Sequence, residues 1–249
     1  MTPTRILAIA GLSTALLSTA NAEIESGISL GYHSDYVYRG LNLGQDLVNA
    51  NLAISGSSEL ADWNLGVGWN RWDTSGDNFD EFLVEASLSR SLCSDPFAAV
   101  LEVGIANHSY SAGTINIPGW GGVFIDPADR FEPFLGISTS LGALDLGTKV
   151  FWNGSSDDWA HDTYWEVTAS YSVDMGANLS STLSVDYGQW DTDPLVGVLD
   201  IGKHFSVTGA IHYAASDSVT LSAYVTHLLP DGWNLDDETH GGASVSLSF

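Results

Sequence analysis

The sequence predicts an all-β fold, a transmembrane antiparallel up-and-down β-barrel of about 12 strands. Three observations in the sequence predict it. Apolar and polar residues alternate with a period of two, as in a strand that has one apolar and one wet face. The connections between the alternating segments are by turns short and long, and aromatic residues gather near the segment ends. Together these features are typical of outer-membrane barrels of Gram-negative bacteria.

The first 22 residues are set apart from this fold. Arg5 places a positive charge before an apolar run over residues 6–17, and residues 20–22 read Ala-Asn-Ala. This order is typical of a cleaved secretory signal. The apolar run is too short for a membrane-spanning helix, which needs about 20 residues. We therefore expect a signal peptide over residues 1–22 and a single barrel domain over residues 23–249.

The strands are predicted one by one from the alternation. In residues 63–70, tryptophan, leucine and valine occupy one face, whereas asparagine and glycine occupy the other. Similar contrast recurs along the chain, least clearly in residues 28–38, 131–140 and 204–213. The predicted strands cover residues 28–38, 48–55, 63–70, 81–88, 99–106, 131–140, 144–151, 165–172, 179–187, 204–213, 219–226 and 241–249.

The connections give the orientation. Short connections are expected near residues 56–61, 90–97, 141–143, 173–177 and 214–218. Mostly longer ones, rich in acidic residues, are expected near residues 39–46, 72–78, 107–129, 153–162, 188–203 and 228–239. Outer-membrane barrels have their short turns on the periplasmic side. Both chain ends lie on the side of the short turns, so we expect the N- and C-termini to be periplasmic.

Aromatic residues form two predicted belts, where rings favour the boundary between membrane and water. The belt at the long connections contains Tyr36, Tyr38, Trp69, Trp72, Trp152, Trp165, Tyr187 and Phe205. The belt at the short turns contains Trp63, Tyr171, Tyr213 and Phe249. A soluble barrel has no reason to sort its aromatic residues in this way. The expected surroundings are therefore outer-membrane lipid and lipopolysaccharide.

The composition excludes some functions. The formal net charge is −24, and phosphate binding needs clustered Lys and Arg, so nucleic acid is excluded as a partner. The single cysteine, Cys93, cannot form an intramolecular disulfide or a thiolate metal cluster. Two acidic stretches, residues 157–162 and 236–238, are rich in the oxygen ligands of divalent cations. Neither matches a defined metal-binding loop, so we predict no metal site and no cofactor.

Strand parity assigns the charged side chains to the interior, because charge facing lipid is costly. Eight acids and three bases share the parity of the polar face. The candidate pore-lining residues are Asp35, Arg39, Glu81, Glu85, Glu102, Arg130, Glu132, Asp145, Lys149, Glu166 and Asp186. If the lumen is open, this balance favours cations. The alternative is that the acids pair with the three bases and partly plug the barrel.

Two motifs resemble those of known outer-membrane proteins. Residues 34–40 read Ser-Asp-Tyr-Val-Tyr-Arg-Gly. This stretch resembles a motif that follows the signal peptide in the TorF-type family, whose members are mostly named as outer-membrane porins by similarity. The resemblance implies a small outer-membrane channel. The last strand, with alternating apolar residues and a terminal Phe249, resembles the C-terminal signal read by the barrel-insertion machinery.

These observations favour passive diffusion of small hydrophilic solutes with a cation bias. One alternative is a structural or surface-interaction barrel whose lumen is filled by side chains. A further alternative, a lipid-modifying enzyme, needs a histidine and a nucleophile facing lipid. His227 alone among the histidines has clear outward parity, and its expected neighbours, Gly241 and Ala243, offer no nucleophile. We therefore predict that the protein is not an enzyme.

Overall fold

The computed structural model describes residues 24–74, 77–92, 98–111, 115–116, 124–125, 129–153, 163–190, 201–232 and 236–249. The predicted signal peptide, Cys93 and the acidic stretch 157–162 lie outside these residues. Within them, no helix is long and apolar enough to cross a membrane. The strands are β1 Ile24–Tyr38, β2 Leu41–Ser57, β3 Asp62–Thr74, β4 Asp77–Ser91, β5 Ala99–Tyr110, β6 Ile115–Asn116, β7 Phe124–Ile125, β8 Arg130–Leu141, β9 Leu144–Trp152, β10 Thr163–Gly176, β11 Leu179–Trp190, β12 Ile201–Ser216, β13 Val219–Gly232 and β14 Glu238–Ser248.

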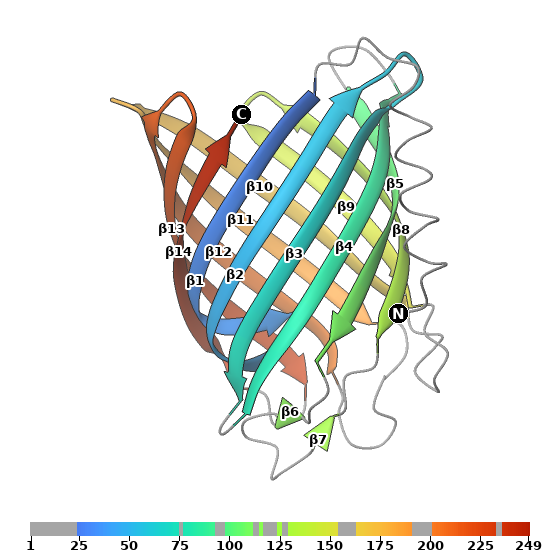
Figure 1. Cartoon of the computed structure of the whole chain (residues 1–249), viewed down its shortest axis with the longest axis vertical. Helices are drawn as coiled ribbons and strands as arrows, with labels where there is room; N and C mark the ends of the chain where they lie inside the picture. The colour runs from blue at the N-terminus through green and yellow to red at the C-terminus, as the bar shows by residue number, and fades with distance from the viewer. Residues whose placement is uncertain are drawn as a thin grey trace.

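Twelve of these strands close into one antiparallel barrel (Figure 1). The order around it is β1-β14-β13-β12-β11-β10-β9-β8-β5-β4-β3-β2. The closing pair, β1 and β14, is in register from Gly27 opposite Ser248 to His33 opposite Gly242. The strands β6 and β7 pair only with each other, within the connection between β5 and β8. The predicted fold, a closed barrel of about 12 antiparallel strands, is confirmed.

The outer face of the barrel is apolar, and the predicted alternation accounts for it. Leu52, Val67 and Val84 lie opposite one another on β2, β3 and β4 and form one row of that face. On β13, Val225 is 58% exposed while its neighbour Thr226, on the inner face, is 7% exposed. Apolar side chains that point away from the interior need an apolar surrounding, and a lipid bilayer supplies it.

The predicted long connections near residues 39–46 and 72–78 are wrong. β1 ends at Tyr38 and β2 begins at Leu41, and β3 continues to Thr74 while β4 begins at Asp77. The strands extend further than the apolar alternation does. Strand pairing depends on backbone hydrogen bonds, whereas alternation depends on each face meeting a different medium. Where neither face of a hairpin meets lipid, the alternation disappears and the strand remains.

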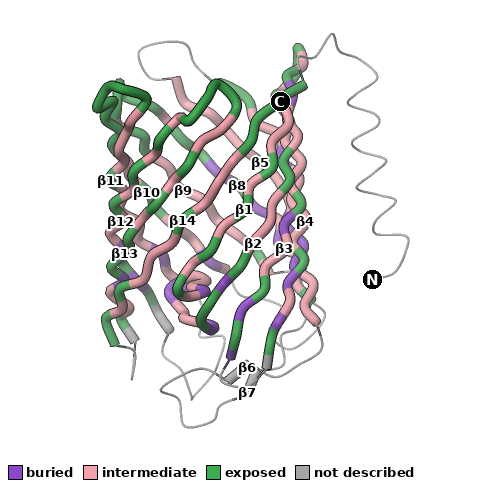
Figure 2. Tube along the Cα trace, turned by 60° about the vertical axis from the view of Figure 1, so that its left-hand side comes forward, coloured by how far each residue is buried: buried purple, intermediate pink, exposed green. Residues whose placement is uncertain are grey.

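Packing is concentrated at one end of the barrel, the end that holds the β1–β2 turn (Figure 2). Among the buried residues other than glycine in the described chain, only Trp63 and Ser87 lie toward the opposite end. The others lie in the halves of their strands nearest the β1–β2 turn. At the opposite end, backbone hydrogen bonds of 3.1 and 2.9 Å join Ser26 and Phe249. The interior is therefore filled asymmetrically along the barrel axis.

Candidate functional site

The end of the β1–β2 hairpin leaves the barrel wall. β1 pairs with β14 only as far as His33, although its pairing with β2 continues to Tyr38. On the other side, regular pairing of β2 with β3 begins at Val48, with one earlier pair at Gln45. At the point of departure, the Ser34 hydroxyl accepts a hydrogen bond of 3.1 Å from the Gly241 amide. We refer to residues 34–46 as the lumen hairpin.

A two-residue turn ends the lumen hairpin. Arg39 and Gly40 both have positive φ, at 50° and 84°, which is typical of the type I′ turn that suits the twist of a hairpin. Gly40 is required for a second reason. A Cβ atom at this position would lie 2.7 Å from Cγ and Nδ1 of His204, on β12. The turn therefore packs directly against the wall of the barrel far from its own strands.

The lumen hairpin crosses the interior of the barrel. Its tip residue Arg39 contacts residues of β8, β9, β10 and β11. In the closed order, β9 lies six strands from β1 in either direction, so these strands form the opposite wall. Figure 1 shows the end of β1 bending into the barrel near the end that faces β6 and β7. The hairpin therefore spans the lumen from one wall to the opposite wall.

The guanidinium of Arg39 is enclosed by one carboxylate and four aromatic rings. Its two terminal nitrogens donate to both Glu132 carboxylate oxygens, at 2.9 and 2.8 Å. The side chains of Arg39 and Glu132 are 9% and 1% exposed. A guanidinium can also stack on ring faces within about 6 Å. The distances from Arg39 Cζ to the ring centres are 4.4 Å for Tyr164, 4.5 Å for Phe151, 4.8 Å for Tyr38 and 5.1 Å for Trp190.

We refer to Glu132 and the four rings around Arg39 as the cage. A series of hydrogen bonds links the cage to β3, β4 and β5. His108 on β5 lies between two acids, with Nδ1 2.7 Å from Glu81 and Nε2 3.5 Å from Glu132. Glu81 also accepts hydrogen bonds of 2.6 Å from the Tyr36 hydroxyl and 2.7 Å from the Asn70 amide. Buried acids are tolerated only when their oxygens are bonded in this way. These bonds fix both carboxylates and, through Tyr36, one edge of the lumen hairpin.

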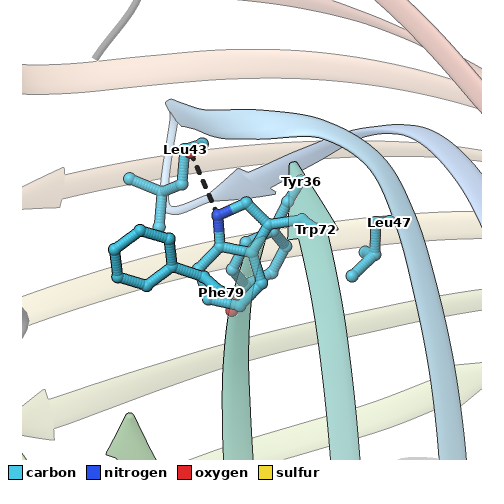
Figure 3. Packing of buried hydrophobic residues seen from close by; sticks show 5 residues of the cluster. All are labelled: Tyr36, Leu43, Leu47, Trp72 and Phe79. Atoms are coloured by element: carbon cyan, nitrogen blue, oxygen red, sulfur yellow. Dashed lines mark hydrogen bonds between the residues drawn. The ribbon is translucent and has the colours of Figure 1, made fainter. Parts of the chain in front are cut away.

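An apolar cluster attaches the base of the lumen hairpin to β3 and β4. Tyr36 and Leu43 from the hairpin, and Leu47 directly after it, pack with Trp72 and Phe79 (Figure 3). The Tyr36 and Trp72 ring centres are 4.5 Å apart, and Trp72 stacks on Phe79 at 5.7 Å. The Trp72 indole nitrogen donates to the Leu43 carbonyl at 3.2 Å. This packing holds the hairpin base independently of its tip.

The other face of the lumen hairpin borders a cavity of about 540 Å³. Val37, Arg39 and Gly40 form its hairpin side, and residues of β10 to β14 form the barrel side. The barrel side is mostly polar and includes two acids, Glu166 and Asp186. The hairpin thus divides this end of the lumen into a packed side toward β3, β4 and β5 and a hollow side toward β10 to β14.

Known structures share this architecture at low sequence identity. No family model and no curated protein sequence matches the chain. KdgM porin has a TM-score of 0.53 and 12% identity over 90% of this chain and 99% of its own. NanC porin has a TM-score of 0.54 and 13% identity over 89% and 98%. An outer membrane channel from Pseudomonas putida F1 has a TM-score of 0.57 and 10% identity over 91% and 95%. The chain has the fold of these porins and channels.

Within this porin fold, the candidate pore-lining residues divide into groups. Arg39, Glu81 and Glu132 belong to the lumen hairpin and its contacts, so they are buried rather than water-exposed. Lys149 pairs with Glu102 at 2.9 Å. These residues follow the predicted alternative in which acids and bases pair and fill part of the lumen.

Two of the candidates flank the lumen hairpin. The Arg130 guanidinium lies 2.5 Å from the Tyr110 hydroxyl and 4.7 Å from the Tyr38 ring centre. Asp35 accepts hydrogen bonds from the Ser34 hydroxyl at 2.6 Å and the Asn42 amide at 3.2 Å. Both therefore support the hairpin.

The remaining candidates are more accessible. Glu166 and Asp186 border the cavity, and Glu85 is half-buried on the same face of β4 as Glu81. Asp145 is exposed at the opposite end of the barrel, where it bonds Ser140. Glu166 is contacted by the Tyr164 hydroxyl at 3.4 Å. Asp186 is contacted by the Ser206 hydroxyl and by His204 at 3.4 Å.

Three residues of the predicted aromatic belt are buried in the lumen instead. Tyr36 and Tyr38 belong to the lumen hairpin and Trp72 packs against it, so none of the three faces lipid. Trp152 and Phe205 are exposed on the outer face, and Trp63, in the other belt, is buried beside Gly56. For Tyr36 and Tyr38, parity fails because β1 leaves the wall after His33 and the face that pointed to lipid then points into the lumen. Trp72, on β3, has the same parity as Asn70 and therefore belongs to the inner face.

The cage residues Tyr164 and Trp190 and the bridging His108 were not predicted as site residues. Trp190 falls in the predicted connection 188–203, whereas β11 extends through it. One signal that could have identified the site is Gly40, because glycine at the second position is typical of two-residue hairpin turns, and it directly follows the charged Arg39. The turn places Arg39 at the tip of the hairpin, and its long side chain can reach the opposite wall from there.

The predicted surroundings of His227 are also corrected. Its partner on β14 is Thr239, and His227 Nδ1 lies 2.9 Å from the Thr239 hydroxyl oxygen. Gly241, which was expected there, lies opposite Val225. The hydroxyl is a possible nucleophile, but no carboxylate contacts His227 within the described residues. Within the part of the chain that the structure describes, His227 has no third group of the kind that orients a catalytic histidine.

Among the described residues, no group of three or more His, Cys, Asp and Glu side chains is arranged to hold a metal ion.

Proposed function

We propose that the protein is an outer-membrane porin that lets small hydrophilic solutes diffuse passively, with a bias toward cations. The observation that carries the proposal is a closed barrel with an apolar outer face and an interior lined by polar and acidic side chains. Such a barrel satisfies all its backbone groups within a bilayer. The likeness to porin structures supports the same function.

The cavity beside the lumen hairpin is the proposed route for solutes at the end of the barrel that holds the β1–β2 turn. On the packed side, the apolar cluster and the Glu81–His108–Glu132 contacts occupy the space between the lumen hairpin and β3 to β5. On the hollow side, Glu166 and Asp186 face the cavity. The mechanism needs no chemical step, because water and solute move along a fixed, charged wall.

The cation bias follows from how the lumen charges are paired. Arg39 and Lys149 each pair with an acid, Glu132 and Glu102. Glu166 and Asp186 are contacted by hydroxyl groups and a histidine. Acidic side chains along a pore favour cations. The wall along the proposed route therefore keeps a negative excess.

The proposed orientation places both termini in the periplasm. The tight turns at residues 142–143 and 177–178 lie at the same end as the Ser26–Phe249 contact, and periplasmic turns of outer-membrane barrels are short. Phe249 is 71% exposed there, which suits recognition of the last strand by the insertion machinery. The partners on the outside are then outer-membrane lipid and lipopolysaccharide. The motif over residues 34–40 supports a relationship with the TorF-type porins.

A second candidate function is a structural or surface-interaction barrel, and the lumen hairpin favours it because the hairpin fills part of the interior. Conductance in planar bilayers separates the two. We expect discrete current steps and, in a salt gradient, a reversal potential of the sign that cation preference gives. Liposome swelling with neutral sugars of graded size reports the cutoff. An absence of both current and swelling for folded protein contradicts the porin proposal, and an anion preference contradicts the bias.

A further inference from the structure

The cage around Arg39 has the full chemistry of a binding site for a guanidinium ion. Two carboxylate oxygens of Glu132 accept from two nitrogens, at 2.8 and 2.9 Å. This paired geometry matches the planar fork of a guanidinium, which an ammonium ion cannot reproduce. Four aromatic ring centres lie within 5.1 Å of the guanidinium carbon. Rings at these distances stabilise a cation through their faces.

Most of this site belongs to the wall and not to the hairpin that fills it. Glu132, Phe151, Tyr164 and Trp190 come from β8, β9, β10 and β11, which are consecutive in the barrel. Their backbones are fixed by the sheet, so the site does not need Arg39 in order to form. Tyr38 alone is supplied by the hairpin. Removing the Arg39 side chain would leave a preformed hollow beside a carboxylate that is 1% exposed.

We propose that these wall residues form a binding site for guanidinium-type cations, and that the chain fills the site with Arg39 as a tethered ligand. With the tether in place, the hairpin tip is fastened to the far wall and the lumen is narrowed. The effect on conduction rests on the proposed porin function, but the binding itself does not. The base of the hairpin is held separately by the Trp72 cluster, so release of Arg39 frees only the tip.

Because Arg39 is covalently part of the protein, free guanidinium must compete with it for the site. A tethered group is present at a high effective concentration. Free guanidinium therefore binds the vacant site of an Arg39→Ala variant at far lower concentration than it displaces Arg39 in the wild type. The matched control is Arg71→Ala. Arg71 is half-exposed and pairs with Asp80 at 3.9 Å, so this variant also loses an arginine in an ion pair.

The binding experiment uses full-length folded protein in detergent and guanidinium chloride at low millimolar concentration, with potassium chloride at equal ionic strength. For Arg39→Ala we expect a saturable rise of about 2–4 °C in unfolding temperature with guanidinium only. The wild type and Arg71→Ala should show no rise in this range. The double variant Arg39→Ala/Glu132→Gln should lose the response. Equal responses of Arg39→Ala and Arg71→Ala, or a response retained without Glu132, would overturn the proposal.

Conductance gives an independent readout. Arg39→Ala should conduct more than the wild type, and low millimolar guanidinium should reduce its current saturably, whereas potassium should not. Arg39→Lys, which keeps the charge but loses the fork, should not bind guanidinium more tightly than Arg39→Ala. If no variant conducts but guanidinium still stabilises Arg39→Ala, the site stands and the porin function fails. If Arg39→Ala conducts without any guanidinium response in either assay, the porin function stands and the site fails.

Discussion

Arg39 and Glu132 are 93 positions apart in the chain, and their side chains form a two-fold hydrogen-bonded ion pair across the interior of the barrel. The pair joins the tip of the β1–β2 hairpin to β8 on the far side. Its geometry is of the kind in which a buried ion pair is effective, because the carboxylate oxygens are bonded and the guanidinium faces are covered by rings. The pair therefore determines where the lumen hairpin rests.

The first prediction concerns this ion pair. Glu132→Gln removes the charge and leaves the Arg39 guanidinium buried without a counterion. Loss of one partner of a buried pair costs about 3–5 kcal/mol, so we expect the free energy of unfolding to fall by up to that amount. Chemical unfolding in detergent measures it. Glu59→Gln, at an exposed turn position, is the control and should be neutral.

A double-mutant cycle with Arg39→Ala decides whether the two side chains act together. If they do, the double variant is less destabilised than the sum of the single variants, because removing both partners leaves no buried unpaired charge. Strictly additive effects would show that the contact contributes little to holding the hairpin.

The second prediction concerns the turn. Gly40→Ala should displace the hairpin tip, because alanine disfavours a φ of +84° and its Cβ would meet the His204 ring. The backbone term alone is about 1–2 kcal/mol. Single-channel recordings should show increased conductance or added current noise.

Gly142→Ala provides the matched control for this turn. Gly142 has a φ of +66°, but no atom lies within 4 Å of where its Cβ would be. This variant carries a similar backbone cost at the opposite end of the barrel and should leave the current unchanged. Equal currents from both variants would indicate that the tip does not limit conduction.

The barrel itself was predictable from the sequence because the lipid and the lumen impose opposite requirements on consecutive residues. Val225 and Thr226 follow that rule, as do residues along most strands. The number of barrel strands follows from counting such segments, and their antiparallel order from the short connections between them. Closure follows because an open sheet edge in a bilayer would leave backbone groups unpaired. Glu166 and Asp186, which parity assigns to the inner face, border the cavity beside the hairpin.

The lumen hairpin was not predictable by the same reasoning. From Ser34 to Asp46 neither face meets lipid, so apolar residues such as Tyr36 and Leu43 mark contact with the inner wall. From the alternation alone, Tyr36 indicated an aromatic belt at the membrane boundary and Leu43 a connecting loop. Nothing local to β1 shows that Arg39 contacts β8 to β11, because those contacts depend on the closed barrel bringing its opposite walls together. The sequence motif over residues 34–40 identified the segment without showing its position.

The third prediction concerns ion preference. Glu166→Gln and Asp186→Asn remove negative charge from the cavity beside the hairpin, and each should lower the ratio of cation to anion permeability. The double variant should lower it further. Reversal potentials in a salt gradient measure the ratio, and the change should weaken at high salt because screening shortens the reach of each charge. Glu59→Gln serves again as the control. A ratio unaffected by the double variant would place the selective region elsewhere in the lumen.

The fourth prediction separates the base of the lumen hairpin from its tip. Trp72 is 1% exposed and contacts Tyr36, Phe79 and the Leu43 carbonyl. Trp72→Ala leaves a large cavity and should cost about 3–5 kcal/mol in unfolding free energy. Trp152→Ala, on the outer face and 43% exposed, removes the same ring and should cost less. Because Trp72 anchors the base while Arg39 anchors the tip, Trp72→Ala combined with Arg39→Ala should release the whole hairpin. We then expect a larger conductance than either single variant gives. A double variant that conducts no more than Arg39→Ala would show that the base stays in place without its tryptophan.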